Sequence, residues 1–201
     1  MSEPAEPSNP FSTRFTRPGA VPFVFTGDDT IEALIERLRR AIWRGQIVGP
    51  HGSGKSTLIE SLVGRLREAG KKPARVRLQA GEHQLPSGWM TEAMRSKADL
   101  LVVDGYDQLW SWRKLALRRF AKRRQLGLLV TTHTDCRLPI IFRTSPDVDV
   151  FQLVVHRLAA GMLEAGQLDL ARAFDASRGN IREGLFALYD QYEQHSVERC
   201  V

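Results

Sequence analysis

Short apolar runs alternate with amphipathic segments as far as Ser145, and only amphipathic segments follow. Continuous apolar runs between turn residues are typical of strands buried on both faces of a parallel sheet. Pro139 suits the edge of such a sheet, because proline donates no ladder hydrogen bond. The pattern predicts strands at Gly45–Val48, Ala74–Leu78, Asp99–Asp104, Gly127–His133 and Leu138–Phe142.

Apolar residues at helical spacing mark the segments between and after these strands. They predict helices at Thr30–Trp43, Thr57–Leu66, Trp89–Ser96, Gln108–Gln125, Val148–Leu163, Gln167–Ser177 and Asn180–Gln194. In the helix from Gln108, the predicted buried face is Leu109, Trp112, Ala116 and Phe120. Strands that alternate with helices, followed by helices alone, predict an α/β fold. We expect a three-layer αβα domain around a parallel sheet, followed by a small C-terminal helical lid.

Composition divides the chain into three parts. Residues 1–22 are rich in Pro, Ser, Thr and Glu, so we expect a flexible N-terminal arm. Phe11, Arg14 and Phe15 are the side chains of this arm that can dock onto the domain. Residues 23–145 form the predicted core, and residues 146–201 form the predicted lid.

The sequence from Gly49 to Ser56, GPHGSGKS, fits the P-loop pattern G-x-x-x-x-G-K-[ST] at every fixed position. A predicted strand precedes it and a predicted helix follows, as the motif requires. The glycines let backbone N–H groups point at phosphate oxygens, Lys55 reaches the β- and γ-phosphates, and Ser56 is placed to bind Mg²⁺. The predicted nucleotide-binding residues are Gly49, Pro50, His51, Gly52, Ser53, Gly54, Lys55, Ser56 and Thr57.

An acid that complements the P-loop ends the third predicted strand. Ligands bind at the carboxyl ends of strands in open α/β sheets, so Asp104 is the predicted second Mg²⁺ ligand. Many P-loop ATPases have Glu at the next position, which here is Gly105. The sequence therefore supports nucleotide binding better than hydrolysis. Asp107 is the nearest acid, and it either activates water as a base or caps the following helix.

Three polar residues, Thr131, Thr132 and His133, end the next strand on the predicted phosphate side of the sheet. One of them is expected to contact the γ-phosphate or the attacking water, and we choose Thr132 and His133. Local turn hydrogen bonds are the alternative explanation for these side chains.

The net charge of +6 is unevenly distributed. Seven Lys and Arg residues and no acid lie between Arg113 and Arg124. Such a helix binds DNA or an acidic protein partner, unless its face is merely solvated. Trp110, a candidate exposed aromatic residue, favours a contact surface.

The composition fits a cytoplasmic domain. No apolar run approaches the roughly 20 residues that a membrane-spanning helix needs. The two cysteines, Cys136 and Cys200, have no metal-ligand spacing, which indicates reduced thiols.

Together these motifs resemble those of the AAA+ ATPases, especially the initiator-like and STAND-type members. GPHGSGKS is similar to their Walker A motif, LLVVDGYD resembles their Walker B motif, and LLVTTH lies where they have sensor 1. SRGNIREGL, from Ser177, resembles the lid helix that carries the sensor 2 arginine, which implies that Arg182 reaches the γ-phosphate. Arg143 falls about where the family has a trans-acting arginine finger. The residues themselves leave open that both arginines are simply solvated.

The resemblance implies a Mg²⁺-dependent, ATP-binding AAA+-like ATPase, whose nucleotide state controls lid and partner contacts and which is able to oligomerise. ATP is favoured over GTP by the resemblance and by the lack of an NKxD-type guanine motif. Two alternatives stay open, a weakly hydrolysing nucleotide switch that acts on DNA or a partner protein, and a small-molecule kinase. The predicted catalytic residues are Lys55, Asp104, Asp107, Thr132 and Arg182, and the predicted Mg²⁺ ligands are Ser56 and Asp104.

Overall fold

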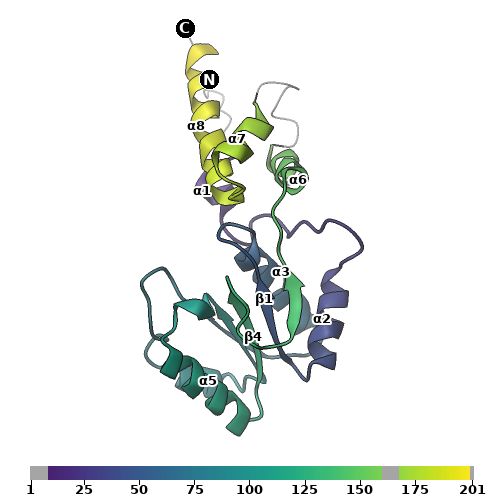
Figure 1. Cartoon of the computed structure of the whole chain (residues 1–201), viewed down its shortest axis with the longest axis vertical. Helices are drawn as coiled ribbons and strands as arrows, with labels where there is room; N and C mark the ends of the chain where they lie inside the picture. The colour runs from purple at the N-terminus through teal and green to yellow at the C-terminus, as the bar shows by residue number, and fades with distance from the viewer. Residues whose placement is uncertain (1–8, 160–167, 200–201) are drawn as a thin grey trace, which may run out of the picture.

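A five-stranded parallel sheet forms the middle layer of the core (Figure 1). The structure, a computed structural model, describes residues 9–159 and 168–199, with side chains as far as residue 194. In space the strand order is β2-β3-β4-β1-β5, which confirms the predicted edge position of the last strand. The strands are β1 Arg44–Val48, β2 Pro73–Arg77, β3 Leu100–Asp104, β4 Gly127–Thr132 and β5 Ile140–Arg143.

Helices cover both faces of this sheet and give the predicted three layers. One face packs on α2 (Ile31–Arg40) and α3 (Lys55–Glu68), and the other on α4 (Trp89–Arg95) and α5 (Ser111–Arg123). Alternate residues of β3 enter the two cores, because successive side chains of a strand point to opposite faces. This two-sided burial explains why the run before Asp104 is wholly apolar.

The buried face of α5 differs from the predicted one. Trp112 is 57% exposed, whereas Leu117 and Ala121 are buried against the sheet. The residues before the helix explain the difference, because Leu109 and Trp110 have extended backbone and lie outside it. A short 3-10 helix, η1 (Tyr106–Gln108), occupies the start of the predicted segment. Leu109 is buried, but it lies before the helix and therefore does not determine which face of α5 is buried.

Three further helices pack together beyond the carboxyl end of the sheet and form the lid (Figure 1). They are α6 (Val148–Leu158), α7 (Leu170–Ala176) and α8 (Ile181–Arg199). Their shared core contains Phe151, Val155, Phe174, Leu185 and Leu188. The end of the predicted helix Val148–Leu163 lies outside the described residues.

The N-terminal segment joins the lid to the core. Phe11 is fully buried among the lid side chains, and the Asn9 side chain donates to the backbone oxygen of Tyr189 at 3.1 Å. A single helical turn, α1 (Thr13–Thr16), follows, and Phe23 then packs against the core. The expected docking of Phe11 is therefore observed, while residues 1–8 of the expected arm lie outside the described residues.

Within the described ranges, no helix is long and apolar enough to cross a membrane. Cys136 is a half-buried free thiol. Cys200 lies outside the described residues.

Candidate nucleotide site

A cavity of about 630 Å³ lies where the P-loop, the N-terminal segment and the lid meet. This volume is within the range of small-molecule sites, roughly 300–1,000 Å³. The P-loop and the ends of β3 and β4 supply its polar side. The N-terminal segment and the lid supply its apolar side, with Phe15, Val21, Phe23, Val24, Val150, Val154, Leu158, Ile181 and Leu185. The contribution of residues 15–24 was not predicted, although the apolar stretch Val21–Phe25 interrupts the Pro-rich composition there.

The P-loop runs from the end of β1 to the start of α3 and is held from both sides. Gly54 lies just before α3 with a φ of 85°, a conformation that glycine adopts without strain. Ser53 is buried, and its hydroxyl donates to the Pro50 oxygen at 2.8 Å and lies 2.6 Å from the Thr144 hydroxyl. These contacts shape the loop in advance of any ligand.

Lys55 turns back onto its own loop. Its Nζ donates to the backbone oxygens of Gly49 at 2.7 Å and Pro50 at 2.5 Å. Burial lowers the pKa of Lys55 to about 8, against the opposing effect of Asp107 and Asp104, and Arg182 lowers it further. An anion in the cavity would stabilise this ammonium group.

Asp104 ends β3 and is almost fully buried. Its Oδ1 accepts a hydrogen bond from the Thr131 hydroxyl at 2.7 Å, while its buried Oδ2 has no hydrogen-bond partner among the described residues. Arg75 and Arg77 lie 3.8 Å from Oδ2, and Arg77 also lines the cavity.

The residues near Asp104 fit a Mg²⁺ ion held jointly with phosphate. Asp104, whose Oδ2 accepts no hydrogen bond among the described residues, and Ser56 both line the cavity, and both carry hard oxygen donors. Magnesium prefers such oxygens and is usually bound by one or two protein groups together with substrate phosphates. The described residues contain no group of three or more His, Cys, Asp or Glu side chains that would hold a metal without the nucleotide.

Asp107 and two histidines gather beside Lys55. Nδ1 of His133 is hydrogen-bonded to Oδ2 of Asp107, and the ring of His133 stacks on that of His51 with centroids 3.6 Å apart. All three residues line the cavity. Burial, His133 and Lys55 lower the pKa of His51, while Asp107 raises it. Asp107 therefore contacts another site residue, and no side-chain hydrogen bond caps the start of α5 at Trp110.

The structure corrects the choice of Thr132. Its hydroxyl lies 3.4 Å from Oε1 of Gln46 on β1, and the residue does not line the cavity. Thr131 and His133 line it instead, because residues two apart on a strand share a face. Thr131 also accepts the Gly105 N–H at 2.8 Å, so it connects the ends of β3 and β4.

Comparison with known proteins shows which solved structures have a similar fold. No family model matches the sequence, and no curated protein matches it. Among solved structures, the chain is similar to domain III of the Thermotoga maritima replication initiation protein DnaA. The TM-score is 0.54 at 14% identity, covering 82% of this chain and 83% of that one. The chain has the AAA+ fold.

Two further structures with the AAA+ fold carry ligands. DnaA bound to AMPPCP and single-stranded DNA gives a TM-score of 0.58 at 14% identity, covering 88% of this chain and 66% of that one. AMPPCP-bound DnaA from Aquifex aeolicus gives 0.52 at 14% identity, covering 87% of this chain and 68% of that one. These likenesses establish the AAA+ fold of the chain.

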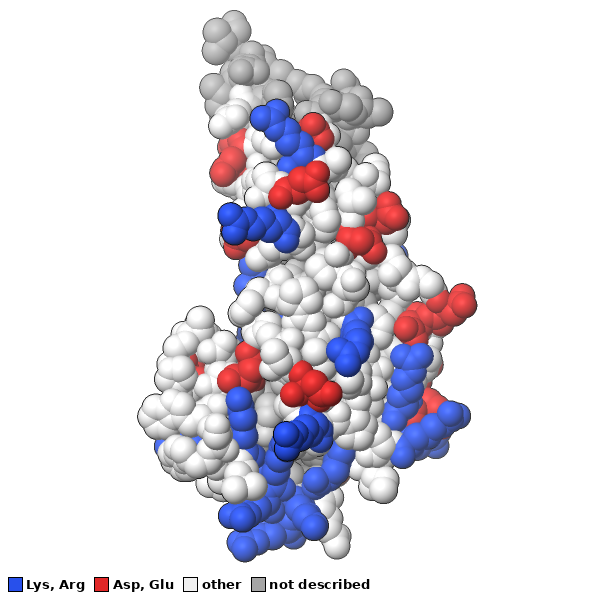
Figure 2. All heavy atoms as spheres, viewed as in Figure 1, with Lys and Arg blue, Asp and Glu red and all other residues white. Residues whose placement is uncertain are grey.

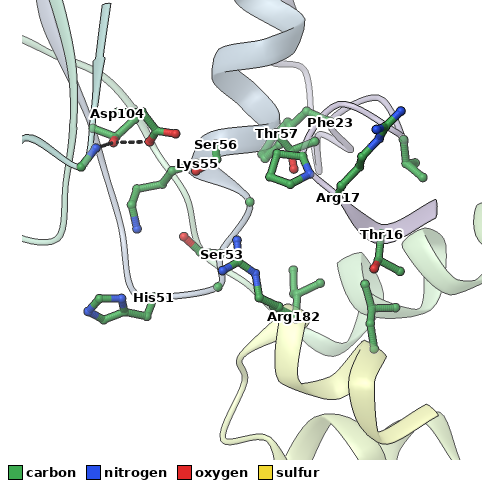
Figure 3. A pocket seen from close by; sticks show the side chains of 18 of the residues that line it. Thr16, Arg17, Phe23, His51, Ser53, Lys55, Ser56, Thr57, Asp104 and Arg182 are labelled. Atoms are coloured by element: carbon green, nitrogen blue, oxygen red, sulfur yellow. Dashed lines mark hydrogen bonds between the residues drawn. The ribbon is translucent and has the colours of Figure 1, made fainter. Parts of the chain in front are cut away.

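In this AAA+ fold the lid reaches the P-loop through the start of α8. Asn180 accepts the backbone N–H groups of Arg182 at 3.1 Å and Glu183 at 3.2 Å, which caps the helix. Gly52 has a φ of 68°, and a Cβ on it would lie 1.7 Å from Oδ1 of Asn180. Figure 3 shows Arg182 extending from the lid towards Ser53. Only glycine at position 52 permits this close approach.

The predicted site residues separate into two groups. His51 to Thr57, Asp104, Asp107, His133 and Arg182 line the cavity. Gly49 and Pro50 do not line it, and instead their carbonyl groups hold Lys55. Arg143 is exposed on β5, away from the cavity lining, so its expected role in contacting a neighbouring copy stays a prediction.

Proposed function

We propose that the chain is a Mg²⁺-dependent ATP-binding protein of the AAA+ ATPase type, in which the bound nucleotide fixes the lid on the core. One observation carries this proposal: a single cavity joins a P-loop lysine, an acidic strand end and an arginine from the lid. The solved structures of this fold that contain AMPPCP, an ATP analogue, support it.

Each side of the cavity matches one part of the nucleotide. The triphosphate lies along His51 to Thr57, where Lys55 exchanges its carbonyl contacts for phosphate oxygens. Ser56 and Asp104 hold Mg²⁺, which neutralises charge on the β- and γ-phosphates when bound. The base packs against the apolar side, between Phe23 and Leu185.

The lid responds to the γ-phosphate through Arg182. This arginine lies close enough to Lys55 to lower its pKa, so two cations face the same space. An anion between them removes their repulsion and attracts both sides of the cavity. Loss of the γ-phosphate restores the repulsion and releases α8 from the P-loop.

Titration with ATP, with and without Mg²⁺, tests this proposal. Lys55→Ala should weaken ATP binding by about 10- to 150-fold, because hydrogen bonds to charged groups contribute about 1.5–3 kcal/mol. ATP binding by Asp104→Asn should depend less on Mg²⁺ than binding by wild type, because Ser56 is then the remaining proposed Mg²⁺ ligand. The control Lys72→Ala removes an exposed lysine outside the cavity and should bind as wild type. Wild-type affinity in Lys55→Ala would overturn the proposed site.

We also propose that the exposed face of α5 binds single-stranded nucleic acid. Arg119, Lys122 and Arg123 are exposed on this helix beside Trp112 and Leu115, which are 57% and 48% exposed. Figure 2 shows Lys and Arg side chains gathered at the end of the core where α5 lies. Cations bind phosphates and exposed aromatic rings stack on bases, so this combination suits an unpaired strand. A DnaA structure of the same fold contains single-stranded DNA.

A further inference from the structure

Three side chains from separate parts of the core meet at the phosphate end of the cavity. His51 comes from the P-loop, Asp107 from η1 and His133 from the residue after β4. His133 is hydrogen-bonded to Asp107 through Nδ1 and stacks on His51 with an angle of 29° between the rings. Two neighbours therefore fix the His133 ring, one by a hydrogen bond and the other by stacking.

Asp107 is poorly placed to receive a proton directly from water. Its Oδ2 is bonded to His133, and its Oδ1 is buried without a hydrogen-bond partner among the described residues. The backbone oxygen of Asp107 accepts from Lys114 Nζ at 3.0 Å, which helps to hold η1 in place. Neither carboxylate oxygen is free to meet a water molecule in the cavity.

His133 has the free atom that Asp107 lacks. In the neutral form of an imidazole that donates through Nδ1 to a carboxylate, Nε2, on the far side of the ring, is an acceptor. We infer that His133 is the catalytic base of ATP hydrolysis in this chain and that Asp107 is the positioning residue that orients it. This inference rests on the proposed ATPase function and names the group that activates water.

Water, ATP, His133 and Asp107 account for every bond and proton that changes in the proposed hydrolysis step. The water oxygen bonds to the γ-phosphorus while the bond from this phosphorus to the β–γ bridging oxygen breaks, and the electron pair leaves with ADP. One water proton moves to Nε2 of His133 and the other stays on the phosphate. The Asp107 carboxylate stabilises the imidazolium that forms, as a base oriented by a third group requires.

Phosphate release in a single turnover, measured beside AMPPCP affinity, separates catalysis from binding. In His133→Ala, hydrolysis should fall about 100-fold or more, the range of general-base catalysis, while AMPPCP affinity stays near that of wild type. Added imidazole should restore part of this loss. Asp107→Asn should also slow hydrolysis, and the double variant should be no slower than His133→Ala, because the two residues act as one unit.

His83 offers a matched control. It also bonds through Nδ1, to the Gln108 oxygen at 2.9 Å, and it stacks on Trp110, but it lies outside the cavity lining. His83→Ala should hydrolyse ATP at the wild-type rate. Should His133→Ala lose thermal stability, His133→Gln repeats the test with a more similar side chain.

Two outcomes overturn the assignment of His133 as the base, and a third contradicts the proposed function. Wild-type turnover in His133→Ala, or in His133→Gln where the alanine variant is unstable, would remove His133 as the base. A wild type that binds AMPPCP and releases no phosphate would also overturn it, and would leave a nucleotide switch. A wild type that binds no AMPPCP would contradict the proposed function itself.

Discussion

At the position after Asp104, the backbone leaves little choice of residue. Gly105 has a φ of 85°, and a Cβ there would lie 2.8 Å from the carbonyl oxygen of Leu78. Any side chain on it would force the segments that follow β2 and β3 to shift, because that contact is with backbone rather than with a flexible group. A catalytic Glu therefore does not fit directly after Asp104, and the nearest acid of the site is Asp107.

Replacing Gly105 by alanine measures what the close contact with Leu78 costs in stability, beyond the cost of backbone strain. Gly105→Ala should lower the free energy of unfolding by more than the roughly 1–3 kcal/mol that a residue in a sparsely populated conformation costs. Gly81→Ala is the matched control, since Gly81 has a φ of 87° and an added Cβ meets nothing within 4 Å among the described residues. Denaturant unfolding measures both variants. Equal losses would show that the Leu78 contact carries no cost.

The residues of this site could be predicted from the sequence where a linear motif defines them. Lys55, Ser56 and Asp104 belong to such motifs, and each lines the cavity. The choice between Thr131 and Thr132 had no comparable signal. Every residue of β4 is buried, so the sequence holds no alternation that would reveal which side chain faces the phosphates.

At the scale of elements, the cations of α5 fall into two groups, those that bond to the core and those that are exposed. Arg118 donates to the Tyr106 hydroxyl at 2.9 Å and to the Cys136 oxygen at 2.6 Å, and Arg113 donates to Gln84 at 3.0 Å. Lys114 holds the backbone of Asp107. These three cations stabilise the core around η1, so the exposed cations further along the helix are the candidates for binding a partner.

Charge reversal on the exposed face tests that partner role. Arg119→Glu with Lys122→Glu should weaken binding of a single-stranded oligonucleotide and flatten its dependence on salt, by about 0.7 in the logarithmic slope for each phosphate that is no longer neutralised. Fluorescence anisotropy at several salt concentrations measures both effects. Arg67→Glu with Arg172→Glu reverses two exposed charges on α3 and α7 and should leave binding unchanged. Equal effects of the two pairs would show only a general charge effect, and binding of an acidic protein instead would reassign the partner.

At the scale of the whole molecule, the chain passes between core and lid twice. Phe11 is buried in the lid, while Phe23 packs edge-on against Phe25 and Phe142 of the core. The second connection is formed by residues 144–147, which lead from β5 into α6. A ligand in the cavity therefore contacts both the N-terminal segment and the lid.

Periodicity predicted the helices of the lid but not where the lid lies. The apolar spacing around Phe151 and Leu188 marks helices that need a partner surface. Their placement over the P-loop depends on the approach of Asn180 to Gly52 and on the burial of Phe11. These contacts join residues more than a hundred positions apart, which local patterns do not encode.

A crystal structure of the chain grown with AMPPCP and Mg²⁺ tests the central claim most directly. We predict the triphosphate along His51 to Thr57, with Mg²⁺ between Ser56 and Asp104 and Arg182 turned to the γ-phosphate. The base should lie between Phe23 and Leu185. An analogue bound elsewhere on the molecule, or a cavity without nucleotide at saturating concentration, would contradict the claim that this cavity is an ATP site.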